Sequence, residues 1–136
     1  MNEMKELLRL ERPVVFLDLE ATGVWLEKDR IVEIALIRIF PDGKEEVYET
    51  RVNPEMKIPP EATAIHHITD NDVKEAPTFK EIAPRVRDFL TGVDVGGFGL
   101  DRLDLPLLEK EFRLAGIEFR FDRCFLLDAK RIFTLK

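Results

Sequence analysis

Cysteine is nearly absent from this chain of 136 residues, which contains Cys124 alone. A single cysteine excludes an internal disulfide, so a cytoplasmic protein is expected. Long apolar runs are missing as well, because no segment approaches the roughly 18 apolar residues of a membrane span. Residues 1–13 carry charges throughout and lack the apolar stretch of a signal peptide. With 45% hydrophobic and 35% charged residues, the sequence predicts one folded domain over residues 1–136.

The chain also lacks a surplus of positive charge. Its 21 Lys and Arg face 27 Asp and Glu, which gives a net charge of −6. Passive nucleic-acid binders usually neutralise phosphates with excess Lys and Arg. An acidic protein can still act on nucleic acid when its carboxylates hold divalent cations that meet the phosphates. The charge balance therefore mildly favours a metal enzyme over a binding module.

Hydrophobic patterning and turn residues predict an α/β domain with a mixed sheet. Thr78 and Glu81 have the spacing of a capping box, and Gly116 is expected to end a second long helix. Strands are expected in residues 13–23, 31–40, 44–54 and 91–99, helices in residues 3–10, 78–90 and 103–115, loop with short helical turns in residues 56–73, and a strand followed by the start of a helix in residues 123–136.

Asp18 and Glu20 are the most informative pair of residues. On a strand, residues two apart project from the same face, so these two carboxylates are expected side by side. Two adjacent carboxylates on an apolar strand repel one another and are costly to bury unless cations lie between them. Oxygen ligands at this spacing suit Mg²⁺ or Mn²⁺. The alternative is an edge strand whose acids face water, which the apolar residues 14–17 disfavour.

A resemblance becomes specific at these residues. The sequence FLDLEATG, followed by DRIVEIALIRIFPDG, is similar to the first motif of the DnaQ-like exonucleases. This family, also called DEDD after its four acidic metal ligands, includes the proofreading epsilon subunit of the bacterial replicative polymerase and RNase T. Its pattern is Asp-x-Glu-Thr-Thr-Gly, then Arg-Ile-x-Glu-Ile. Ala21 replaces the first Thr, Thr22 and Gly23 match, and Glu33 matches the Glu of the second strand.

Two further stretches resemble the family in order and spacing. In PEATAIHHITD, Glu61 and His66 match positions that contact substrate, and His67 replaces the usual Gly. VGGFGLDRLDLPLL resembles the second motif, in which Asp104 matches the third acid and Gly99 replaces an Asn.

The family's last motif, which would supply a fourth acid and a general base, is His-x-x-x-x-Asp or Tyr-x-x-x-Asp. Neither pattern occurs here, because the only histidines are His66 and His67 and the only tyrosine is Tyr48. The resemblance therefore implies a ribonuclease-H-like mixed sheet of about five strands with the second strand antiparallel, flanked by helices and lacking the C-terminal helices. A domain shortened in this way is expected to expose apolar sheet surface, which a homodimer would cover.

The resemblance also implies a function. Asp18, Glu20 and Asp104 are the expected catalytic residues and ligands of two Mg²⁺ or Mn²⁺ ions. Thr22 and Gly23, through backbone N–H groups, are expected to bind substrate together with Glu61 and His66. The expected reaction is 3′–5′ hydrolysis of single-stranded DNA or RNA ends to nucleoside 5′-monophosphates. A DNA polymerase is an expected partner. The alternative is a non-catalytic nucleic-acid- or polymerase-associated module with the same fold.

Several of these residues have plainer alternatives. His66 is as well explained as a capping or surface histidine, and Glu61 as an acid that favours a helix N-terminus. Asp104 has the same helix-terminal alternative, although its motif context favours metal binding. Trp25 follows the first motif, where its ring is expected either to stack on a base or to pack within the loop.

Overall fold

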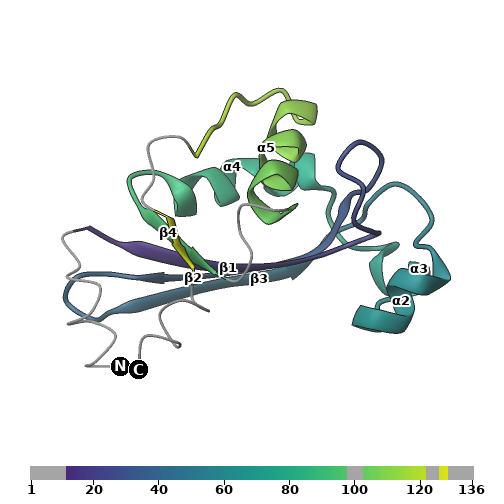
Figure 1. Cartoon of the computed structure of the whole chain (residues 1–136), viewed down its shortest axis with the longest axis horizontal. Helices are drawn as coiled ribbons and strands as arrows, with labels where there is room; N and C mark the ends of the chain where they lie inside the picture. The colour runs from purple at the N-terminus through teal and green to yellow at the C-terminus, as the bar shows by residue number, and fades with distance from the viewer. Residues whose placement is uncertain (1–11, 98–102, 122–125, 129–136) are drawn as a thin grey trace.

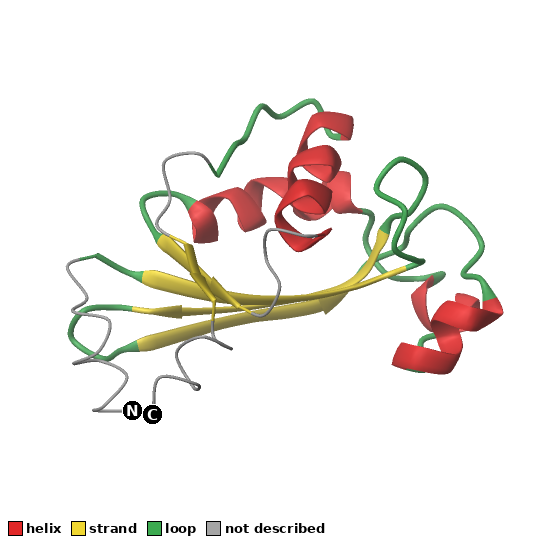
Figure 2. Ribbon diagram, viewed as in Figure 1, coloured by secondary structure: helices red, strands yellow, loops and turns green. Residues whose placement is uncertain are grey.

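A computed structural model describes residues 12–97, 103–121 and 126–128 (Figures 1 and 2). The expected helix over residues 3–10 and most of the expected C-terminal strand and helix lie outside these ranges. The strands are β1 (Val14–Ala21), β2 (Ile31–Ile39), β3 (Glu45–Arg51), β4 (Asp94–Gly97) and β5 (Leu126–Asp128). The helices are α2 (Pro60–His66), α3 (Asp70–Val73), α4 (Phe79–Leu90) and α5 (Leu105–Leu114).

The five strands form one mixed sheet in the order β3-β2-β1-β4-β5. β2 is antiparallel to both β1 and β3, whereas β4 is parallel to both β1 and β5. The predicted sheet, with its antiparallel second strand, is confirmed. β1 lies in the middle of the sheet, so the alternative of an edge strand for Asp18 and Glu20 is wrong.

One face of the sheet packs against α4 and α5, which both lie on the same side of it (Figure 1). Alternate residues of β1, Val15 and Leu17, join the buried apolar residues of these helices in the main core. Because strand side chains alternate between faces, Asp18 and Glu20 project from the other face. A smaller core holds α2 and α3 against the start of β2, and consists of Val32, Ile58, Ala62, Ile68 and Val73.

The helix ends follow local sequence closely. The capping box of α4 forms as predicted, because the Thr78 hydroxyl accepts from the Glu81 N–H while the Glu81 carboxylate accepts from the Thr78 N–H. Gly116 has a φ of +81° just after α5, in the left-handed region that favours glycine. His67, which stands where the family has glycine, also has a left-handed φ of +64°. Within the described residues, no helix has the length and apolar character needed to cross a membrane.

Candidate active site

The end of β1 carries the first two carboxylates of the site. Asp18 pairs with Ala35 of β2, and Glu20 pairs with Glu33, so a third acid stands directly across from Glu20. Directly opposed residues of an antiparallel pair have side chains close enough to interact. A β-bulge follows between Glu20 and Ala21 and ends the regular ladder.

Asp104 precedes the first residue of α5 and lies near the end of β1. The helix expected over residues 103–115 does begin at Leu103, because Leu103 and Asp104 form a short π-helical turn that leads into α5 at Leu105. The Asp104 carboxylate makes no capping hydrogen bond to the helix. The alternative role as a helix-terminal acid therefore has no hydrogen bond to support it, and the carboxylate is left to face Asp18 and Glu20.

Burial and neighbouring carboxylates raise the pKa of two of these acids, Glu20 and Asp104. Burial, followed by the charges of Asp18 and Glu20, raises the pKa of Asp104 to about 6. Burial, then the charge of Asp18, also raises the pKa of Glu20, although His66 partly opposes this. No Lys or Arg contributes to either shift. The site therefore concentrates negative charge that no Lys or Arg offsets and that His66 offsets only in part.

Asp104→Asn is expected to stabilise the metal-free protein at pH 7. The pKa of Asp104 is about 6 in the folded protein, against an ordinary value of 3.8. The protonated Asp104 side chain therefore stabilises the fold fully below about pH 4, and this stabilisation is lost as the pH rises through about 6. A two-unit shift corresponds to ~3 kcal/mol, which solvent screening at this half-buried site reduces to ~1 kcal/mol. Urea unfolding in EDTA from pH 4 to 7 measures the gain.

The control for this experiment is Asp88→Asn, because the Asp88 carboxylate is exposed on α4 and does not belong to the site. The difference between wild type and Asp104→Asn should widen between pH 4 and 7. A difference that stays constant over this range would show that Asp104 does not experience the charges of Asp18 and Glu20.

A pocket of about 160 Å³ opens beside the carboxylates. Glu20 and Asp104 form part of its wall. The remaining lining residues come from β1, the loop after it, α2 and the start of α5, and they are Leu19, Ala21, Gly23, Val24, Ala62, Ile65, His66, Leu103 and Leu107. The pocket therefore places an acidic end beside a largely apolar wall.

The His66 imidazole ties α2 to the end of β1. Its Nδ1 accepts a hydrogen bond of 3.1 Å from the Ile68 N–H, so the proton is on Nε2, which lies 3.0 Å from the Ala21 carbonyl oxygen and donates to it. Both ring nitrogens are therefore engaged with backbone, although the ring still lines the pocket. Glu61, by contrast, is exposed and does not line this pocket. The substrate contacts of both residues stay predictions.

Sequence comparison decides the family to which this site belongs. The family model described as Exonuclease (RNase_T) matches residues 15–127, which includes β1, the carboxylates and α5. The chain belongs to this exonuclease family. The resemblance to DnaQ-like exonucleases is thereby confirmed.

Three relatives match between 55% and 87% of this chain. A DNA polymerase III subunit epsilon-like protein of Rhodobacter capsulatus is 37% identical over 110 residues, which are 78% of this chain and 15% of that protein. DNA polymerase III subunit epsilon of Treponema pallidum is 36% identical over 75 residues, 55% of this chain and 35% of that protein. The 3′-5′ exonuclease DinG of Staphylococcus aureus is 26% identical over 118 residues, 87% of this chain and 13% of that protein. The chain thus spans only a small part of each relative.

Solved structures show the same fold. E. coli exonuclease I in complex with a dA16 oligonucleotide superposes with a TM-score of 0.79 at 18% sequence identity, over 90% of this chain and 29% of that one. The complex with a dT13 oligonucleotide gives a TM-score of 0.78. At this identity the likeness establishes the ribonuclease-H-like fold.

The loop after β1 of the exonuclease domain is held by a buried polar network. The Thr22 side chain is 1% exposed, and its hydroxyl donates to Asp29 Oδ1 at 2.8 Å and accepts from the Arg30 N–H at 3.0 Å. The Thr22 N–H donates to the Arg30 carbonyl at 2.9 Å. The Thr22 N–H thus has a partner within the loop, and the contact of Thr22 with substrate stays a prediction.

Gly23 is the loop residue that lies closest to the Asp29 carboxylate. A Cβ at Gly23 would lie 2.4 Å from Asp29 Oδ2, which is far inside van der Waals contact. Only glycine allows the chain to pass this carboxylate and still line the pocket. Gly23 thus lies beside the pocket, and its contact with substrate stays a prediction.

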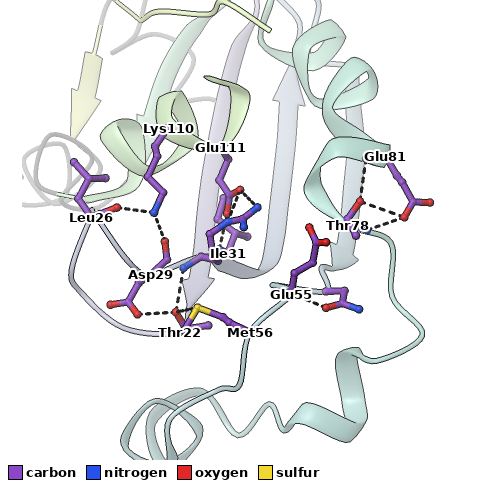
Figure 3. Close-up of polar contacts among 12 residues, drawn as sticks. Thr22, Leu26, Asp29, Ile31, Glu55, Met56, Thr78, Glu81, Lys110 and Glu111 are labelled. Carbon is purple, nitrogen blue, oxygen red and sulfur yellow. Dashed lines mark hydrogen bonds and ion pairs between the residues drawn. The ribbon is translucent and has the colours of Figure 1, made fainter. Parts of the chain in front are cut away.

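Two charged residues of α5 hold the same loop, and the sequence patterns did not predict this role. Figure 3 shows Lys110 between Leu26 and Asp29, whose carbonyl oxygens accept from its Nζ at 2.6 and 2.5 Å. Glu111 is 1% exposed and accepts from the Ile31 N–H at 2.9 Å and from the Arg30 guanidinium at 2.8 and 3.0 Å. The helix that follows Asp104 therefore also fixes the loop beside the pocket.

The donor atoms of the exonuclease site suit hard divalent cations. Carboxylate oxygens are the ligands that Mg²⁺ and Mn²⁺ prefer, and burial followed by neighbouring carboxylates raises the pKa of Glu20 and Asp104. Among the described residues, however, no three His, Cys, Asp or Glu side chains are already gathered closely enough to hold one ion. The residue types and the negative charge fit a divalent ion.

Proposed function

We propose that this chain forms a metal-dependent 3′–5′ exonuclease domain that hydrolyses the terminal phosphodiester bonds of DNA or RNA to nucleoside 5′-monophosphates. The observation that carries the proposal is the concentration of three carboxylates, Asp18, Glu20 and Asp104, beside a pocket and without a Lys or Arg to offset them. The names of the relatives, DNA polymerase III epsilon and DinG 3′-5′ exonuclease, support the direction of cleavage.

In the proposed mechanism, Asp18, Glu20 and Asp104 hold two Mg²⁺ or Mn²⁺ ions. When bound, such ions lower the pKa of an attacking water and stabilise the leaving 3′-oxygen. The apolar wall formed by Val24 and Ile65 receives the terminal nucleotide, and its phosphate lies toward the acidic end of the pocket. His66 does not serve as the general base, because its Nδ1 lone pair accepts from the Ile68 N–H and its Nε2–H donates to the Ala21 carbonyl.

Single-stranded DNA or RNA 3′ ends are the proposed substrates. The solved relatives with TM-scores of 0.79 and 0.78 are complexes of exonuclease I with dA16 and dT13 oligonucleotides. The epsilon relatives suggest association with a DNA polymerase, as in proofreading. Because this chain covers 15% and 35% of those two proteins, such association is a proposal, as is the homodimer expected from the sequence.

A 5′-labelled single-stranded oligonucleotide with Mn²⁺ tests the proposal. The wild-type chain should produce a ladder that shortens from the 3′ end, and Asp18→Ala/Glu20→Ala should produce none. The matched control is Glu45→Ala/Glu49→Ala, which removes two exposed carboxylates from β3 of the same sheet.

The absence of an already gathered ion-binding set among the described residues favours one alternative, a non-catalytic module that binds nucleic acid or a polymerase. If the wild-type chain binds the oligonucleotide without shortening it, this alternative replaces the exonuclease. If both the double variant and wild type cleave equally, the carboxylates are not the catalytic residues.

A further inference from the structure

Trp25 is the chain's single tryptophan, and its ring stands in solvent. The residue is 68% exposed, and its neighbour Val24 is 78% exposed. Within the described part of the chain, the indole makes no ring–ring or cation–π contact. The alternative in which Trp25 packs within its loop is therefore wrong, and a large aromatic surface is left without an internal role.

The backbone that carries this ring is held firmly. The Trp25 N–H donates to Asp29 Oδ2 at 2.8 Å, and the Trp25 carbonyl accepts from the Asp29 N–H at 2.8 Å. The next carbonyl, that of Leu26, accepts from the buried Lys110. Asp29 is itself 1% exposed. Buried side chains thus hold the backbone of this turn in place, so the residue that carries the indole is fixed.

The position of this turn connects it to the catalytic pocket. Gly23 and Val24 line the pocket together with Glu20 and Asp104, and Trp25 follows them directly. Ile65 of α2, which also lines the pocket, is 78% exposed. Trp25 is therefore the direct chain neighbour of a residue of the pocket wall.

We propose that Trp25 is a stacking platform for an unpaired nucleobase of a single-stranded nucleic acid, with Asp29 and Lys110 as the residues that position it. The proposal rests on the proposed exonuclease function. Stacking suits this protein because every base has a π-face, so an aromatic ring binds a strand without reading its sequence. It also suits a chain with a net charge of −6, in which phosphate contacts supply less affinity.

Because Trp25 is the only tryptophan, its fluorescence reports on this site alone. In an Asp18→Asn background, which slows consumption of the probe, single-stranded oligothymidylate with Mn²⁺ should quench the emission, and the corresponding blunt duplex should quench it less. Anisotropy of a labelled oligothymidylate should show binding about 5- to 150-fold weaker in Trp25→Ala and nearly unchanged in Trp25→Phe. Ile65→Ala also removes an exposed apolar side chain, but from the pocket wall. Its binding affinity is compared with that of Trp25→Ala to separate the loss of the ring from the loss of apolar surface.

The outcomes separate this inference from the proposed function. If wild type cleaves and Trp25→Ala has the same affinity and the same KM, the platform is overturned and the exonuclease stands. If wild type neither binds nor cleaves the oligonucleotide, the proposed function fails first and the platform with it. If binding depends on Trp25 but cleavage never occurs, the platform stands in a non-catalytic module.

The positioning role of Lys110 is tested by Lys110→Met, with Lys80→Met on the exposed side of α4 as the matched control. Removal of the ammonium frees the Leu26 and Asp29 carbonyls, so the fluorescence anisotropy of Trp25 should fall and KM should rise more than kcat falls. Lys110→Arg should restore part of both. An unchanged Trp25 anisotropy in Lys110→Met would overturn the positioning role.

Discussion

Asp18→Asn is expected to abolish hydrolysis while the protein remains folded. Asp18 is exposed at the end of β1, and its charge contributes to the raised pKa of both Glu20 and Asp104. The amide keeps the shape of the side chain but is a poorer ligand for a divalent ion. Because metal ions supply several kcal/mol of transition-state stabilisation, the rate of 3′-end shortening should fall by about a thousandfold or more.

The same variant is expected to lose activity without losing stability. Removal of one of three mutually repelling carboxylates should leave the thermal midpoint of the metal-free protein unchanged or slightly higher. Glu49→Gln, an exposed acid on β3, is the control that should change neither activity nor stability. If Asp18→Asn lost activity only because it unfolded, circular dichroism and the thermal midpoint would show it.

Glu111→Ala is expected to produce the largest loss of stability. The Glu111 carboxylate is 1% exposed and accepts from the Ile31 N–H and from the Arg30 guanidinium. Alanine would leave a buried N–H and a cation without partners and a gap against the sheet. Removal of one member of such a buried pair costs about 3–5 kcal/mol, which urea unfolding would measure.

Glu118→Ala is the matched control for this measurement, because Glu118 is exposed just after α5. Its effect should stay within about 0.5 kcal/mol. Glu111→Gln should lie between the two, since the amide oxygen can still accept from the Ile31 N–H while the charge opposite Arg30 is lost. A Glu111→Ala variant as stable as wild type would show that the loop and α5 are held together by apolar contacts alone.

The sheet was predictable because its signals are local and repeated. The β-branched runs of β1 and β2, and the capping box of Thr78 and Glu81, each determine structure through neighbouring residues in the chain. The antiparallel second strand came from the family resemblance, because the α/β pattern by itself does not assign strand direction. The helical start at Leu103 was predictable from the apolar period, whereas the π-helical form of Leu103 and Asp104 was not.

The carboxylates of the site were predictable because two acids on one face of a central strand repel one another unless cations lie between them. The network under the 22–30 loop was not predicted, since it joins residues about 80 positions apart in the sequence. One signal was present: Lys110 and Glu111 lie three and four residues after Leu107, on the apolar face of the helix. Charges on such a face indicate buried partners, but the sequence does not say which backbone groups they meet.

Helix α5 links two of the proposed roles, that of Asp104 in catalysis and that of the Trp25 turn in strand binding. Asp104 precedes the helix and Glu111 lies two turns further along, a rise of about 10 Å. A helix of this length moves as a rigid rod, so a shift along its axis would displace the acid and loosen the turn that carries Trp25 in one movement. A protein or an inhibitor that pushes on this helix would therefore act as a single switch, weakening both activities together without entering the pocket.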